Sequence, residues 1–84
     1  MKILYTIDIY SKETEDLLSE IEVPPEKAHE MADILGLNAK DREEFACGVG
    51  VYNLTKNQAL QFELLLGKRF FSDDVTLQVS GGGI

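Results

Sequence analysis

The residue types that most often carry chemistry are scarce in this chain. His29 is the only histidine and Cys47 the only cysteine among 84 residues. On a helix, His29 would share one side with Asp33 at i+4 and Glu26 at i−3. Groups on a single helical face diverge too much for a tetrahedral metal site, so we expect only a local hydrogen bond or ion pair there. The sequence therefore predicts no metal and no cofactor.

Cys47 and the glycines that follow it do not form a motif with a known chemistry. A nucleophilic cysteine needs an electropositive setting, whereas Glu43 and Glu44 are the charges nearest to Cys47 in the sequence. We therefore expect Cys47 to be a small buried core residue. Gly48-Val49-Gly50 lacks the further glycines of a dinucleotide loop and the lysine of a Walker loop. These glycines are expected to permit a bulge or close packing beneath a helix.

Adjacent carboxylates occur three times, but their sequence context does not favour catalysis. General acid–base catalysis needs two acids held in different environments within a pocket. None of the pairs Glu15-Asp16, Glu43-Glu44 and Asp73-Asp74 lies in an apolar stretch. A domain of this size also has little volume for a ligand pocket. We expect a protein that is not an enzyme.

The charge of the chain is concentrated in its first half. Residues 1–44 hold twelve acids and five bases, and residues 45–84 hold three of each, which gives the net charge of −7. Nucleic-acid binding needs a basic surface, so direct binding of nucleic acid is not expected. An acidic surface attracts basic protein surfaces and speeds encounter with them. The alternative is a solvated acidic surface that only keeps the protein soluble.

The first half of the chain contains one clear strand, one ambiguous segment and one helix. Residues 2–10 alternate apolar and polar side chains, which predicts a half-buried strand, and the polar residues 11–16 predict a turn. Residues 17–23 fit either a helix or a strand, and the nearby turn and Pro24 favour a hairpin partner. A helix is then expected from the two prolines to Gly36, because proline suits a first turn and glycine a C-terminal end.

The second half is expected to contain a strand, a capped helix and a last strand. Residues 38–44 are charged and predict a loop or a single turn, and residues 46–52 are β-rich. Thr55 and Gln58 have the spacing of a capping box, which begins a helix that ends at Gly67. Residues 75–79 alternate as a strand.

These elements predict one α+β domain in the order β-β-α-β-α-β, with an antiparallel or mixed sheet and two helices on one face. The domain is expected to span residues 1–80. Residues 81–84, Gly-Gly-Gly-Ile, are expected to form a flexible tail.

The acid-rich hairpin and first helix are the predicted partner-binding surface. On a strand, the glutamates of residues 17–23 would project from one face, and the acids of the first helix would lie opposite its apolar stripe. Such a surface could imitate phosphate spacing toward a protein that binds nucleic acid. The predicted contact residues are Glu13, Glu15, Asp16, Glu20, Glu22, Glu26, Glu30 and Asp33.

Several short segments in this order resemble a family of small bacterial domains. They are Lys-Glu-Thr-Glu at residues 12–15, Glu-Ile-Glu-Val-Pro at 20–24, Ile-Leu-Gly-Leu at 34–37 and Leu-Leu-Leu-Gly at 64–67. In these segments and their order, the chain is similar to immunity proteins of contact-dependent growth inhibition systems. The resemblance implies an antitoxin-like protein that binds a toxin domain, in particular a nuclease, and occludes its active site with an acidic surface.

The cellular setting and two alternative functions follow from other features of the sequence. One cysteine cannot form an internal disulfide, and no apolar run approaches the ~18 residues of a membrane span, so we expect a cytoplasmic protein. One alternative is a homodimeric assembly module that pairs through the last strand and its glycine tail. The other is a small metal-binding or enzymatic domain that uses His29, Asp33 and Cys47.

Overall fold

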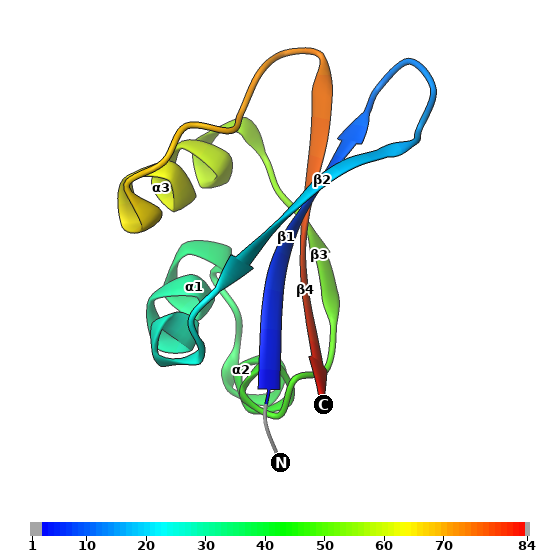
Figure 1. The fold of residues 1–84 in the computed structure, drawn as a ribbon. Coiled ribbons are helices and arrows are strands. Elements are labelled where there is room, and N and C mark those ends of the chain that lie inside the picture. The colour runs from blue at the N-terminus through cyan, green and yellow to red at the C-terminus, as the bar shows by residue number, and fades with distance from the viewer. Residues whose placement is uncertain (1–2, 84) are drawn as a thin grey trace.

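A computed structural model describes residues 3–83, which form an antiparallel sheet with helices packed on one face (Figure 1). The sheet order is β2-β1-β4-β3, and every neighbouring pair is antiparallel. The predicted α+β class is confirmed, and the sheet contains no parallel pair. The strands are β1 (Ile3–Ser11), β2 (Leu17–Val23), β3 (Val51–Asn53) and β4 (Val75–Gly83).

The alternation of β1 places one set of side chains in the core. Tyr5, Ile7 and Ile9 are buried, because they face the helices while the residues between them face away. The ambiguous segment 17–23 is the strand β2, so the favoured prediction is confirmed. Its residue Val23 pairs with Tyr5 and is buried with it.

The helical layer contains one short 3-10 helix and three α-helices: η1 (Pro25–Lys27), α1 (Ala28–Leu35), α2 (Ala39–Ala46) and α3 (Lys56–Leu66). Both predicted helix ends are confirmed, because Gly36 and Gly67 take left-handed conformations at φ 68° and 66°. The predicted capping box is also present. The Thr55 hydroxyl accepts from the Gln58 amide at 3.2 Å, and the Gln58 side chain accepts from the Thr55 amide at 2.9 Å.

The helix α2 was not expected, since residues 38–44 were predicted to be a loop or a single turn. Asn38 begins this helix, and its side-chain oxygen accepts a hydrogen bond from the Asp41 amide at 2.8 Å. Phe45 is the only buried residue of α2. A single buried apolar residue produces no helical periodicity in the sequence. The helix α2 therefore depends on tertiary packing and not on a local pattern.

The predicted strand at residues 46–52 is largely wrong. Ala46 ends α2, and only Val51 and Tyr52 of that stretch belong to β3. Gly48 and Gly50 have φ of 79° and 118°, and they turn the chain from α2 into β3. Cys47 lies in this connection and is exposed, so its predicted burial in the core is also wrong.

The last strand extends further than predicted and does not lie at an edge. Gly81, Gly82 and Gly83 belong to β4 and pair with β1, so the prediction of a tail beginning at residue 81 is wrong for these residues. A Cβ on Gly81 would lie 3.2 Å from the Gly48 backbone, which explains why glycine fits where two chain segments approach. Ile84 lies outside the described residues. Because β4 lies between β1 and β3, the edge strands are β2 and β3.

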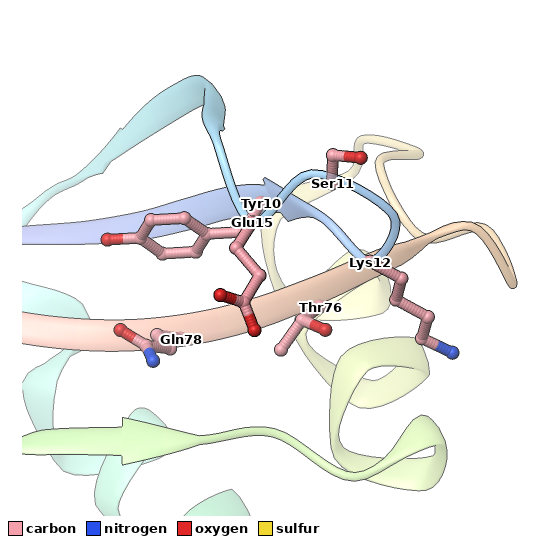
Figure 2. Close-up of a pocket in the computed structure, with 6 residues that line it drawn as sticks. All are labelled: Tyr10, Ser11, Lys12, Glu15, Thr76 and Gln78. Atoms are coloured by element: carbon pink, nitrogen blue, oxygen red, sulfur yellow. The ribbon is translucent and has the colours of Figure 1, made fainter.

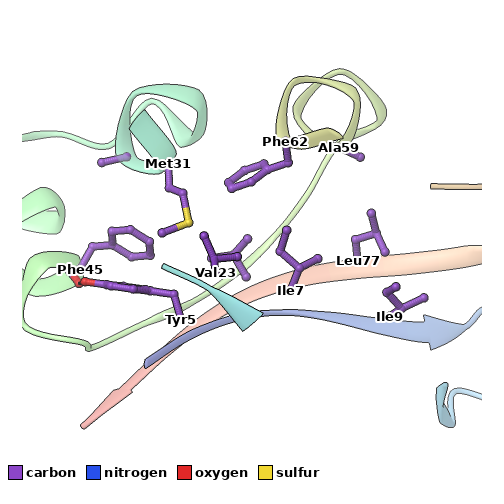
Figure 3. Close-up of a cluster of buried hydrophobic side chains, with 11 residues drawn as sticks. Tyr5, Ile7, Ile9, Val23, Met31, Phe45, Ala59, Phe62 and Leu77 are labelled. Carbon is purple, nitrogen blue, oxygen red and sulfur yellow. The ribbon is translucent and has the colours of Figure 1, made fainter. Parts of the chain in front are cut away.

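The core lies between the sheet and the three helices, and Figure 3 shows Met31 of α1 and Phe62 of α3 directed toward the strands. The rings of Tyr5 and Phe45 have centroids 4.8 Å apart. The buried Tyr5 hydroxyl donates to the Phe45 carbonyl at 2.6 Å, and this bond joins β1 to α2. The opposite face of the sheet has no helical cover (Figure 1).

Candidate functional site

The uncovered face of the sheet presents polar and acidic side chains to solvent. It is formed by the residues that alternate with the core-facing ones, and we call it the open face. Its members are Leu4, Thr6, Asp8, Tyr10, Leu17, Glu20, Glu22, Val51, Asn53, Thr76, Gln78 and Ser80. An uncovered antiparallel sheet commonly has one solvated face, so polarity alone does not indicate a site. We therefore base the candidate site on the arrangement of the carboxylates on this face.

Asp8 is held at the centre of the open face by two hydroxyl groups. Thr6 Oγ1 donates to Asp8 Oδ1 at 2.9 Å, and Ser80 Oγ donates to Asp8 Oδ2 at 3.0 Å. The two hydroxyl oxygens lie 3.0 Å apart. Both carboxylate oxygens therefore accept a hydrogen bond from the protein, which fixes the orientation of Asp8 on a rigid strand.

Two glutamates of the edge strand lie beside this network. Glu20 is directly opposite Asp8, and Glu22 is directly opposite Thr6. Side chains at opposed positions of antiparallel strands have Cβ atoms roughly 4.5–5.5 Å apart, and like charges there are destabilising. Among residues 3–83 the only ion pairs involve Asp33, so no lysine or arginine neutralises these three carboxylates. The open face thus carries uncompensated negative charge.

A cavity of about 390 Å³ lies at the hairpin end of the open face. Figure 2 shows the side chain of Glu15 extending from the hairpin over the sheet toward Thr76, beside the ring of Tyr10. Glu15 takes a left-handed conformation at φ 63°, and its amide donates to the Ser11 carbonyl at 2.8 Å. The turn conformation therefore brings a fourth carboxylate to the open face.

The predicted contact residues do not form one continuous surface. Glu15 lies over the open face, and Glu20 and Glu22 belong to it. Glu13 and Asp16 are exposed in the same hairpin. The other three, Glu26, Glu30 and Asp33, are exposed on η1 and α1, in the layer on the opposite side of the sheet.

Asp33 differs from the other predicted contact residues because it already pairs with a cation, Arg42. It accepts a short hydrogen bond from Arg42, and His29 Nε2 lies 3.7 Å from its other carboxylate oxygen. The hydrogen bond from Arg42 lowers the pKa of Asp33 below its ordinary value. The expected local contact of His29 with Asp33 is present, and Asp33 is less available to an external partner than the glutamates.

Sequence reasoning missed Asp8, Tyr10, Gln78 and Ser80 as members of the site. The alternation of residues 2–10 placed Thr6 and Asp8 on one side of the strand, which was the available signal. The pairing of Asp8 with Glu20 and its contact with Ser80, 72 positions away, depend on the strand register. The register cannot be obtained from the alternation of single strands.

The residues considered for catalysis lie in different parts of the fold and do not form one site. His29 lies in the helical layer, Cys47 lies between α2 and β3, and Ser80 with Asp8 lies on the open face. Among residues 3–83 there is no group of three His, Cys, Asp or Glu side chains that could hold a metal ion. Asp8 and Ser80 thus form a hydrogen-bonded acidic surface without a histidine beside them.

A second cavity, of about 610 Å³, lies between η1, α1 and α2. Its lining is mainly apolar, with Ala28, Ala32 and Phe45 among the residues that form it. Arg42 also lines it, and the Nη1 atom of this side chain has no hydrogen-bond partner among the described residues. Glu26 and Glu43 line the cavity as well, and Arg42 pairs with Asp33 through its Nη2 atom.

Comparison with known families places the chain in one of them. A family model described as a domain of unknown function, DUF7683, matches residues 4–80. The chain belongs to this family. The match covers all four strands and all three α-helices of the DUF7683 domain, apart from the ends of β1 and β4. No curated protein and no solved structure matches the chain.

Within residues 3–83, no helix has the length and apolar character needed to cross a membrane.

Proposed function

We propose that this domain is a non-catalytic binding protein whose open face and hairpin bind a basic surface of a partner protein. The observation that supports it best is the set of three uncompensated carboxylates, Asp8, Glu20 and Glu22, on a face that no helix covers. Placing Asp8 opposite Glu20 costs stability in the isolated domain. Such a cost is reasonable where the charges are neutralised in a complex.

In the form of this proposal that follows from the resemblance, the domain is an immunity protein of the bacterial cytoplasm. Its partner is a toxin domain with a nuclease activity. The carboxylates of the open face would then occupy the lysines and arginines that bind the phosphates of the toxin's substrate. Charge complementarity of this type speeds association, and nuclease–immunity pairs include complexes with Kd values down to about 10⁻¹³ M.

The test begins with the protein encoded next to this chain's gene, which the proposal expects to be a basic nuclease. The purified chain should inhibit that nuclease at a one-to-one ratio. The double variant Glu20→Lys/Glu22→Lys should inhibit it at least about tenfold less well, which corresponds to about 1.4 kcal/mol of binding free energy. Failure of the wild-type chain to inhibit removes the immunity function, and unaltered binding by the variant removes the open face as the contact surface.

The alternative function, a homodimeric assembly module, is supported by one structural observation. β2 is an edge strand of seven residues, and exposed edges can pair with other chains. The predicted pairing through the last strand is not available, since β4 is interior. Sedimentation of the purified chain separates a dimer from a monomer.

A further inference from the structure

The outer edge of β2 has no strand beside it. β2 is terminal in the sheet and pairs only with β1. Among the described residues, no backbone group of Leu17–Val23 bonds to anything outside that pair. Such an edge presents a row of free N–H and C=O groups that can bind an extended chain.

We propose that the β2 edge binds an extended segment of the partner protein as an additional strand. The segment carries lysine or arginine at alternate positions that face Glu20 and Glu22, and apolar residues at the positions between them. This inference rests on the proposed function, because it specifies how the basic partner docks.

The side of the added strand that faces the open face must be basic. Glu20 and Glu22 are both exposed and project to the same face of β2, two residues apart. Side chains of an added strand at the opposed positions would lie roughly 4.5–5.5 Å from them by Cβ atoms. Lysine or arginine at these positions forms cross-strand ion pairs and relieves the repulsion with Asp8.

The other side of the added strand must be apolar. Ile21 is half-buried and lies beside a groove of about 340 Å³, which Leu65 and Leu66 of α3 also line. Apolar side chains of an added strand would fill this groove and bury the apolar surface that lines it. Glu22, Lys27 and Lys68 also line the groove, and because two of these three charged groups are lysines, basic residues are disfavoured on this side.

A second copy of this chain is a poor occupant of the edge. In an antiparallel pairing of two β2 strands centred on Ile21, Glu20 of each copy would lie opposite Glu22 of the other. Like charges at opposed positions are destabilising, and charged edge strands are a common protection against self-association. The edge therefore favours a basic partner strand over its own copy.

The proposal is tested with a blocked peptide that alternates valine and lysine and matches the seven residues of β2. The peptide is titrated into the isotope-labelled chain, and amide chemical shifts and amide hydrogen exchange are followed by NMR. We expect the largest shift changes along Leu17–Val23 and slower exchange of its outward amides. A peptide with glutamate in place of lysine should bind at least about tenfold more weakly. The variant Glu20→Lys/Glu22→Lys should reverse this preference.

Two N-methylated versions of the valine–lysine peptide separate strand addition from simple charge attraction. Each blocks one of the two alternating sets of peptide amides, so one of them must remove the bonds to β2. We expect that version to bind at least about tenfold more weakly than the unmodified peptide. Equal binding of all three peptides, shift changes centred away from β2, or no measurable binding would overturn strand addition. The proposed function is tested apart from this, by inhibition of the folded nuclease.

Discussion

Single side chains in this domain join segments that are far apart in the sequence. Tyr5 on β1 donates its hydroxyl hydrogen to the Phe45 carbonyl at the end of α2. Glu63 of α3 accepts from the amides of Phe70 and Phe71 at 2.8 and 2.9 Å, which holds the segment leading into β4. These contacts position the elements around the open face without belonging to it, so they allow stability to be tested apart from binding.

Removing the Tyr5 hydroxyl should destabilise the fold. The variant Tyr5→Phe removes one of the two donors to the Phe45 carbonyl, which also accepts from the Gly48 amide at 3.0 Å, and this loss costs about 0.5–1.5 kcal/mol. For a domain of this size each kcal/mol lowers the melting temperature by roughly 4–8 °C, which thermal denaturation measures. Tyr10→Phe is the control, because Tyr10 lies on the open face and its hydroxyl makes no hydrogen bond within the described residues. Equal melting temperatures of wild type and Tyr5→Phe would contradict this account.

Glu63 should make the stability of the domain depend on acid pH. The hydrogen bonds from the Phe71 and Phe70 amides lower the pKa of Glu63 below its ordinary value of 4.5. The folded state therefore binds this proton more weakly than the unfolded state, and the contribution of Glu63 is present above pH 4.5 and is lost as the pH falls below it. Urea titrations at a series of pH values should show a flatter acid dependence for Glu63→Gln. Parallel curves for the two proteins would show that the carboxylate does not cap this segment.

Among the elements, the helix α2, the turn from it into β3 and the end of β4 are the features that sequence patterns did not show. The alternation of β1, the capping box at Thr55 and the glycine ends of α1 and α3 were predictable, because each depends on neighbouring residues. The helix α2 and the short β3 were not, because one buried residue, Phe45, and two left-handed glycines decide them through tertiary packing. The extension of β4 through Gly81 follows from its close approach to Gly48, which no local pattern shows.

The turn after α2 should depend on Gly48 more than the end of α1 depends on Gly36. Both glycines have left-handed backbones, and a non-glycine residue there costs roughly 1–2 kcal/mol. A Cβ on Gly48 would also lie 3.0 Å from Ile3 Cγ2, whereas nothing lies within 4 Å of one on Gly36. Chemical denaturation should therefore show a larger loss for Gly48→Ala than for Gly36→Ala. The reverse order would mean that the turn does not pack against β1 as described.

The isolated domain should become more stable when the charge of Glu20 on the edge strand β2 is removed. Glu20→Gln keeps the shape of the side chain and removes the like-charge pair with Asp8, which should stabilise the isolated domain by about 0.2–1 kcal/mol. The control Glu30→Gln is on the exposed side of α1 and should change stability less. A loss of stability in Glu20→Gln would show that Asp8 and Glu20 do not repel each other in the folded chain.

At the scale of the whole molecule, the negative charge occupies two sides that the sheet separates. The excess of acids in residues 1–44 was evident from the sequence, but their division between the open face and the helical layer required the topology. The predicted contact residues of the hairpin and β2 stay together with Asp8, whereas those of η1 and α1 lie in the opposite layer. We therefore propose the open face, and not net charge alone, as the partner-binding surface.

The most direct test of that assignment compares two charge-reversed variants of equal net charge. Association with the neighbouring-gene nuclease is measured by stopped flow at low and high salt for wild type, Glu20→Lys/Glu22→Lys and Glu26→Lys/Glu30→Lys. We expect reversal on the open face to slow association at least about tenfold at low salt and to weaken its salt dependence, while reversal on the helical layer changes both much less. Equal slowing by the two variants, or slowing only by the helical one, would contradict the open face as the binding surface.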